Sequence, residues 1–336
     1  MAVGRMMKAL QITALEHAEM IEMPVPQQEE GEVLLKILAV VTCSQFDLHI
    51  YQGRPMLDPT QPVTFPQPPG HPGHEWVGEV VEVGPGVSAL DLGDWVCVPG
   101  GRGHGRAHPG AYCQYRVCHE SLTLKVPVGM DPLKLAPVEM AACVGASMLD
   151  LKAVNAIEGR RCGVSGLGPA GLIAAQMLRA EGAEEVVGVE TSPWRRAYAL
   201  SHRIVDRAID PLGEDGKALP LRNHLGAVDV SMDCAGARTA VHYMMDHTSD
   251  IVSLFAVQRE PYTFEGWYVG LHQGLKVLGT PSRTPSAGEY AVRRVVNGSI
   301  DLSLTVTHTT PLGDYNRAMA MLRRQECLKV CFLPNG

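Results

Sequence analysis

The chain lacks long hydrophobic runs, closely paired cysteines and clusters of basic residues. No stretch reaches the roughly 18 uninterrupted apolar residues of a membrane-spanning helix, and residues 1–7 contain no apolar segment typical of a secretory signal. The nine cysteines are scattered, with no C-x-x-C pair, which argues against a disulfide framework and for a reducing compartment. We therefore expect a cytoplasmic protein without a membrane partner.

Charge is sparse and slightly acidic. Charged residues make up 19% of the 336 residues, and the formal net charge is -7. With no basic run, a nucleic-acid partner is not expected, and a small-molecule substrate is the better hypothesis. The length suggests about two domains.

The hydrophobic period changes along the chain. From Lys8 to about Val128, short apolar runs alternate with period two between glycines and prolines, which predicts a β-rich, partly barrel-like domain. After about Glu139, strand-like and helix-like segments alternate, which predicts a parallel, doubly wound sheet and an α/β fold class. The last fifty residues contain strand-like runs around one helix, and we expect them to fold back onto the first domain. The predicted domains are 1–142 and 143–285, and 286–336 is predicted as a C-terminal segment that returns to the first domain.

A glycine-rich turn lies between a predicted strand at 161–165 and a predicted helix at 170–181. Its residues are Gly166, Leu167, Gly168, Pro169, Ala170 and Gly171. In a G-x-G-x-x-G turn, the three glycines allow the tight turn, the close approach of backbone to a pyrophosphate, and the packing of helix on strand. This context predicts dinucleotide binding, and a glycine turn kept only for packing is the less favoured interpretation.

An acidic residue follows the next predicted strand. Glu190 is placed to accept hydrogen bonds from the adenosine ribose, and its charge would repel a 2′-phosphate, which favours NAD over NADP. Arg195 and Arg196 follow closely, and an arginine there can accommodate a 2′-phosphate. NADP therefore stays the second choice.

The first half contains candidate metal ligands. Cys43 follows a strand-like run, His74 and Glu75 precede another, and Glu139 lies just before the nucleotide-binding half. Thiolate, imidazole and carboxylate are the ligand types that zinc prefers, and a catalytic site uses about three of them. Each residue alone is more often a core, capping or solvated side chain, so the residue types leave both interpretations open.

At this point the sequence resembles a known family, the medium-chain, zinc-type alcohol dehydrogenases, in particular the branch of sorbitol and threonine dehydrogenases. The resemblance covers nearly the whole chain. The motifs that carry it, besides the glycine turn, are Lys8-Ala9-Leu10, Gly73-His74-Glu75-x-x-Gly78-x-Val80, Gly93-Asp94-x-Val96, Asp229-Val230-x-x-Asp233-Cys234-Ala235-Gly236 and Val306-Thr307-His308.

The resemblance implies a GroES-like catalytic domain, a Rossmann domain and a site with one catalytic zinc. By similarity, Cys43, His74 and Glu139 are expected to bind that zinc, with Glu75 as the adjacent carboxylate that coordinates or lies behind the ligands. The other residues that the resemblance assigns are Ser44 and His49 for proton relay, Asp47 for orienting a ligand, and Leu254, Phe255, Ala256, Thr280 and Pro281 near the nicotinamide.

The chain departs from the family pattern in three places. The family spacing C-x-x-D-x-H is lengthened by one residue between Cys43 and Asp47, so that Ser44 stands where the register expects the ligand. His71 repeats the pattern of His74 three residues earlier, and a shifted register would exchange the two. The segment 100–110 replaces the cysteine-rich structural-zinc lobe and contains no cysteine, so we expect no structural zinc.

The sequence therefore predicts a zinc- and NAD-dependent oxidoreductase that transfers a hydride between a secondary alcohol or polyol and NAD. Two alternatives stay open, a zinc-free NADPH-dependent enone or quinone reductase on the same fold, and a dinucleotide-binding redox sensor without turnover. By similarity we expect a homodimer or homotetramer, and the sequence does not choose between them.

Overall fold

The computed structural model describes residues 5–55, 60–98, 110–258, 262–270, 274–280 and 284–336. The chain divides into two compact units. One boundary between them falls between Ala142 and Cys143, within the helix Val138–Ala153. The first unit comprises Met1–Ala142, Thr284–Val296 and Leu302–Gly336, and the second comprises Cys143–Arg283 and Asn297–Asp301. Among the described residues, no helix is long and apolar enough to span a membrane.

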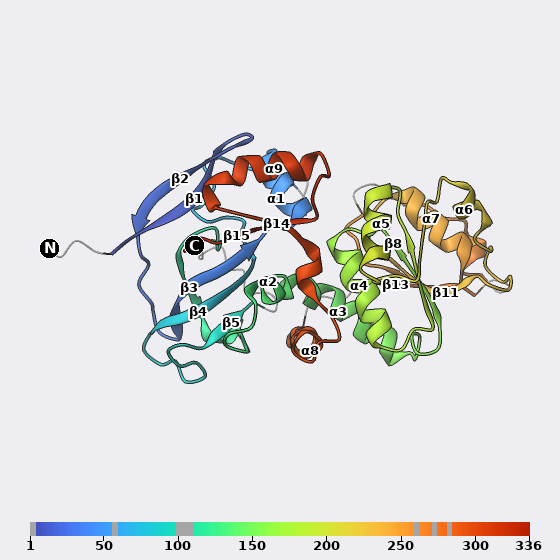
Figure 1. Cartoon of the computed structure of the whole chain (residues 1–336), viewed down its shortest axis with the longest axis horizontal. Coiled ribbons are helices and arrows are strands. Elements are labelled where there is room, and N and C mark those ends of the chain that lie inside the picture. Colours follow the sequence, from blue (N-terminus) through green and yellow to red (C-terminus); the bar gives the residue numbers. More distant parts are fainter. Residues whose placement is uncertain (1–4, 56–59, 99–109, 259–261, 271–273, 281–283) are drawn as a thin grey trace. The chain divides into compact units, whose positions relative to one another are not determined.

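The first unit is rich in strands (Figure 1). Its strands are β1 (Met6–Ala14), β2 (His17–Pro24), β3 (Glu32–Val41), β4 (Glu75–Val83), β5 (Trp95–Cys97), β6 (Tyr115–His119), β7 (Leu124–Val126), β14 (Val306–Thr310) and β15 (Lys329–Phe332). Its helices are α1 (Ser44–Tyr51), α2 (Pro132–Leu135), the start of α3 (Val138–Ala153), α8 (Pro285–Val296) and α9 (Tyr315–Arg323).

Strands β1 and β2 form a separate hairpin, whereas the larger sheet has the order β14-β15-β3-β4-β5-β7, with β6 also paired to β3. The period-two runs explain this arrangement, because alternate side chains of β3 and β4 enter one core around Leu35, Ile37 and Trp76, all at most 1% exposed. Burying such an apolar side chain stabilises the fold by about 1.5–3 kcal/mol.

The register of the larger sheet brings three strand ends together. β3 is antiparallel to both β4 and β15, with Val41 opposite Glu75 of β4 and opposite Cys331 of β15. The end of β3 therefore lies beside the starts of β4 and β15. The residues that follow or begin these strands, Cys43, Glu75 and Lys329, are brought to one place by pairing alone.

The second unit is a doubly wound, parallel sheet (Figure 1). Its strands are β8 (Arg161–Ser165), β9 (Glu185–Val189), β10 (Arg207–Ile209), β11 (Val228–Asp233), β12 (Thr248–Leu254) and β13 (Lys276–Gly279). Its helices are the rest of α3, α4 (Pro169–Ala180), α5 (Pro193–Ser201), α6 (Glu214–Ala218) and α7 (Arg238–His247).

Every strand pair of this sheet is parallel, and the order is β10-β9-β8-β11-β12-β13. The order reverses between β8 and β11, and in such sheets ligands bind outside the carboxyl ends of the strands at that point. The predicted fold class, a β-rich GroES-like domain with a doubly wound Rossmann sheet, is confirmed.

Candidate functional site

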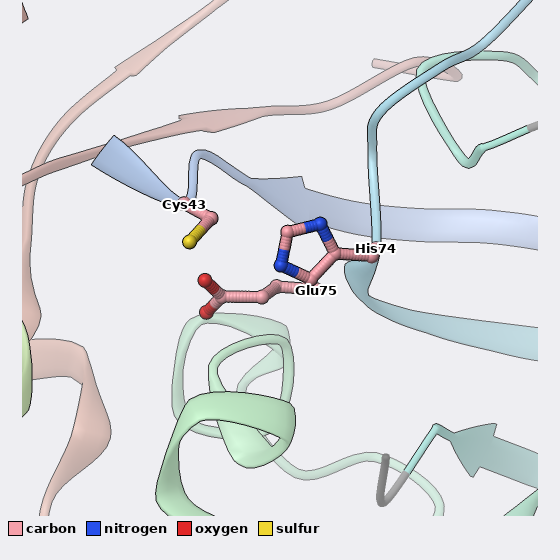
Figure 2. A group of neighbouring side chains, drawn as sticks. All are labelled: Cys43, His74 and Glu75. Atoms are coloured by element: carbon pink, nitrogen blue, oxygen red, sulfur yellow. The ribbon is translucent and has the colours of Figure 1, made fainter. Parts of the chain in front are cut away.

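Three side chains from the converging strand ends form a group that could hold a metal ion. Cys43 follows β3, His74 precedes β4 and Glu75 begins it, and their ligand atoms all lie within 4.8 Å of one another. Figure 2 shows the sulfur, the imidazole ring and the carboxylate converging on one region. Thiolate sulfur, imidazole nitrogen and carboxylate oxygen are the donors that zinc takes, so these residues fit the ion.

Cys43, rather than Ser44, contributes its side chain to this group. The extra residue in the sequence is absorbed at the start of α1, where Cys43 is the N-cap residue with an extended backbone. The Ser44 hydroxyl instead donates a hydrogen bond to the backbone oxygen of Leu328 at 2.6 Å. An alignment to the family pattern that is set by Asp47 alone would have placed Ser44, and not Cys43, at the ligand position.

Asp47 holds the start of α1 in place. One of its oxygens accepts a hydrogen bond from the Cys43 backbone N–H at 2.7 Å, and the other accepts from the hydroxyls of Tyr112 at 2.6 Å and Tyr315 at 3.2 Å. Burial raises the pKa of Asp47 to about 7, and the hydrogen bond from Tyr112 lowers it. Asp47 therefore fixes the backbone that carries Cys43. His49, on the same helix, is partly buried.

Glu139 approaches the group from α3. It lies in the first turn of that helix, is 2% exposed, and places a carboxylate oxygen 4.0 Å from Nε2 of His74. Cys43 is partly buried, and desolvation followed by the charge of Glu75 raises the pKa of its thiol to about 12. Since a bound cation stabilises a thiolate, a metal ion would reverse that shift.

Lys329 is the residue of this region that the sequence analysis missed. Its ammonium donates hydrogen bonds to both oxygens of Glu75, at 2.6 and 2.8 Å, and to the backbone oxygen of Thr42 at 2.9 Å. Lys329 and Glu75 are both fully buried. The available signal was a single lysine within the apolar run from Leu328 to Phe332, because a lysine is almost never fully buried without a partner.

In the second unit, the glycine turn connects β8 to α4. Gly166 has a φ of +84°, a conformation that disfavours side chains, and Gly168 is the N-cap of α4. A Cβ on Gly171 would lie 1.8 Å from the carbonyl oxygen of Gly166, so only glycine fits there. The backbone N–H groups at the start of α4 are suited to bind a phosphate.

Glu190 lies beside this turn, after the end of β9. Its carboxylate accepts hydrogen bonds from the backbone N–H groups of Leu167 and Ser192, both at 2.9 Å, and Glu190 is 8% exposed. The Arg195 guanidinium is 3.8 Å from the same carboxylate and 3.8 Å from where a Cβ of Gly168 would stand. Arg196 instead pairs with Asp210 at 3.2 Å.

The other residues predicted to contact the cofactor lie at the carboxyl ends of neighbouring parallel strands. Thr280 follows β13 and donates a hydrogen bond to the backbone oxygen of Leu254 at 2.7 Å, while the N–H groups of Phe255 and Ala256 donate to the backbone oxygen of Asp233 at 3.1 and 2.9 Å. The structure thus brings them to one edge of the sheet. Pro281 lies outside the described residues, as do His104 and His108 of the glycine-rich loop.

Comparison with known proteins gives relatives along nearly the whole chain. Residues 29–128 match the model of the alcohol dehydrogenase GroES-like domain. The chain is 29% identical to L-threonine 3-dehydrogenase of Thermococcus kodakarensis over 95% of each protein. It is 26% identical to sorbitol dehydrogenase of Halalkalibacterium halodurans, over 95% of this chain and 96% of that enzyme.

Solved structures share the fold. The structure of 2R,3R-butanediol dehydrogenase of Bacillus subtilis has a TM-score of 0.83 at 23% identity, and the match covers 98% of this chain and 100% of that one. A Sinorhizobium meliloti structure with bound NADP has a TM-score of 0.83 at 22% identity, with the same coverage of 98% and 100%. A GroES-like β domain followed by a doubly wound sheet is thus the fold that this chain shares with these solved structures.

The resemblance to the medium-chain, zinc-type alcohol dehydrogenases that was inferred from the motifs is confirmed by these relatives. The curated relatives are dehydrogenases of alcohol-type donors, which supports an oxidoreductase acting on CH–OH groups.

Proposed function

We propose that the protein is a zinc- and NAD-dependent dehydrogenase that oxidises a secondary alcohol or a polyol. The observation that carries the proposal is the group of Cys43, His74 and Glu75, whose ligand atoms lie within 4.8 Å of one another in a chain that resembles the zinc-type alcohol dehydrogenases. The relatives named above act on L-threonine, sorbitol and 2R,3R-butanediol, all of which carry secondary hydroxyl groups.

Cys43, His74 and Glu139 would hold the metal, because they supply three different donors and leave a fourth position open. When bound, zinc would supply a Lewis acid that makes the substrate hydroxyl more acidic, and NAD would supply the hydride acceptor. Asp47 fixes the backbone of Cys43, and Lys329 engages both oxygens of Glu75. Glu75 is therefore proposed to stay behind the ligands while Lys329 holds it.

The substrate proton must leave the site along polar groups. Ser44 and His49 stay the candidates by similarity, and the Ser44 hydroxyl would have to exchange its bond to Leu328 to take part.

The second unit would hold NAD, with the pyrophosphate at the start of α4 and the adenosine ribose at Glu190. The Glu190→Ala variant is expected to reduce the preference for NAD over NADP by about tenfold or more, because a charge-assisted hydrogen bond contributes about 1.5–3 kcal/mol. The measurement is kcat/KM for each cofactor with one alcohol. Glu184→Ala is the matched control, because Glu184 is exposed and precedes β9, whereas Glu190 follows that strand.

If Glu190→Ala leaves the ratio unchanged, Glu190 makes no contact with the ribose. Its carboxylate would then serve only the backbone N–H groups of Leu167 and Ser192.

The overall proposal is tested by NAD reduction with a panel of simple secondary alcohols, polyols and amino alcohols, using zinc-loaded protein. Activity with at least one class, and its loss on zinc removal with recovery on zinc return, is the expected result. NADPH-dependent reduction of an enone by zinc-free protein would favour the alternative reductase instead.

A further inference from the structure

Phe46 lies in the lengthened segment between Cys43 and Asp47, and its side chain contacts one of the candidate metal ligands, His74. Three residues separate Cys43 from Asp47. Ser44 is bonded to the backbone of Leu328, Gln45 is exposed, and Phe46 is partly buried. The Phe46 ring lies 5.3 Å from the ring of His74, at an interplanar angle of 82°.

The same ring also contacts the second histidine of the duplicated motif. Its centroid is 6.3 Å from that of His71, at an interplanar angle of 74°. Both contacts have the perpendicular geometry that aromatic pairs prefer. Two departures from the family pattern, the lengthened spacing and the repeated histidine, thus meet in one aromatic cluster, Phe46, His71 and His74.

The backbone that carries His71 and His74 is closely packed. The N–H of Ala111 donates a hydrogen bond to the backbone oxygen of Gly73 at 2.7 Å. The N–H of Gly70 donates one to the backbone oxygen of Leu10, also at 2.7 Å. A Cβ on Gly70 would lie 2.3 Å from the backbone oxygen of Gly110. The two histidine rings therefore project from a fixed segment, and Phe46 meets them from α1.

The cluster is aromatic, and its Phe46 ring carries no polar group. Burial lowers the pKa of His71, which favours the neutral imidazole. The Phe46 ring stabilises apolar groups that pack on it and offers no hydrogen bond to the hydroxyls of a polyol, whose desolvation would go uncompensated. A substrate bound to a metal ion on His74 would lie near Phe46, because the two rings are in contact.

We propose that Phe46 is a positioning residue for His74 and the wall against which the substrate's carbon chain packs. The protein then prefers a secondary alcohol with an apolar substituent over a polyol. This inference rests on the proposed function, because it needs His74 to be a metal ligand.

The positioning part is tested with Phe46→Leu and Phe46→Ala, each compared with Phe264→Leu. Phe264 is 39% exposed in the other unit and serves as the matched control. Zinc affinity by chelator competition is expected to fall about tenfold in Phe46→Ala, as for other groups that orient a ligand, and the Co²⁺-substituted protein should show a shifted d–d spectrum. Phe46→Leu guards against misfolding, and it should show a smaller change of the same kind.

Wild-type protein that binds neither zinc nor cobalt contradicts the proposed function itself. Wild-type protein that binds zinc, with affinity and spectrum unchanged in Phe46→Ala, overturns the positioning role alone.

The substrate part is tested with hexan-2-ol and sorbitol, which share a six-carbon chain and differ in their hydroxyls. We expect kcat/KM to be higher for hexan-2-ol, and the ratio to fall about tenfold or more in Phe46→Ser, the scale on which apolar pockets discriminate. A wild-type preference for sorbitol, turnover of neither compound, or an unchanged ratio in Phe46→Ser would overturn the substrate preference.

Discussion

Replacing Lys329 with methionine is expected to destabilise the metal-free protein by about 3–5 kcal/mol, the usual cost of breaking a buried ion pair. The reason is that the carboxylate of Glu75 would stay fully buried while both of its oxygens lose the hydrogen bond from Lys329. The free energy of unfolding from urea titrations, followed by a probe of the first unit, measures the effect.

Two variants make this result interpretable. Lys125→Met breaks an exposed pair with Asp94 in the same unit, where the lysine side chain is 48% exposed, and should cost at most about 1 kcal/mol. The double variant Glu75→Gln with Lys329→Met removes both charges and should recover more than half of the loss. If Lys329→Met costs no more than Lys125→Met, the buried pair does not stabilise this region.

Zinc binding is expected to depend on Cys43 and not on Ser44. Cys43→Ser replaces a thiolate with a hydroxyl, which is not among the usual ligands of protein zinc sites. We expect zinc affinity to fall by at least about 100-fold, because the loss of a group that only orients a ligand already costs up to about 100-fold. Alcohol-dependent NAD reduction should fall with it.

Ser44→Ala is the matched control, one residue along the same turn. Its hydroxyl bonds to the backbone oxygen of Leu328, so zinc affinity should stay within about threefold of the wild type. The reverse pattern, zinc lost in Ser44→Ala and kept in Cys43→Ser, would show that the register based on Asp47 is the correct one.

The sequence predicted those features that depend on residue type and local pattern. The period-two runs and the βαβ alternation indicated both sheets, and the glycine turn was found because its three glycines have separate physical roles. The donor types of Cys43, His74 and Glu75 made them candidate zinc ligands, and the resemblance to zinc-type alcohol dehydrogenases favoured that interpretation. The structure brings the three together where β3 ends and β4 begins.

Contacts between distant segments could not be predicted in this way. Lys329 and Glu75 are 254 positions apart, and they meet because β15 and β4 both pair with β3. Whether Cys43 or Ser44 faces the group was left open, since it depends on how Asp47 fixes the first turn of α1. The contact of Phe46 with both histidines depends on the same turn.

The most direct test of the account is metal analysis of the protein purified without chelator. We expect about one zinc per chain in the wild type. The Cys43→Ser variant should lose this zinc, and the Ser44→Ala variant should keep it. Less than about half a zinc per chain in the wild type, with undiminished NAD reduction by an alcohol, would contradict the account.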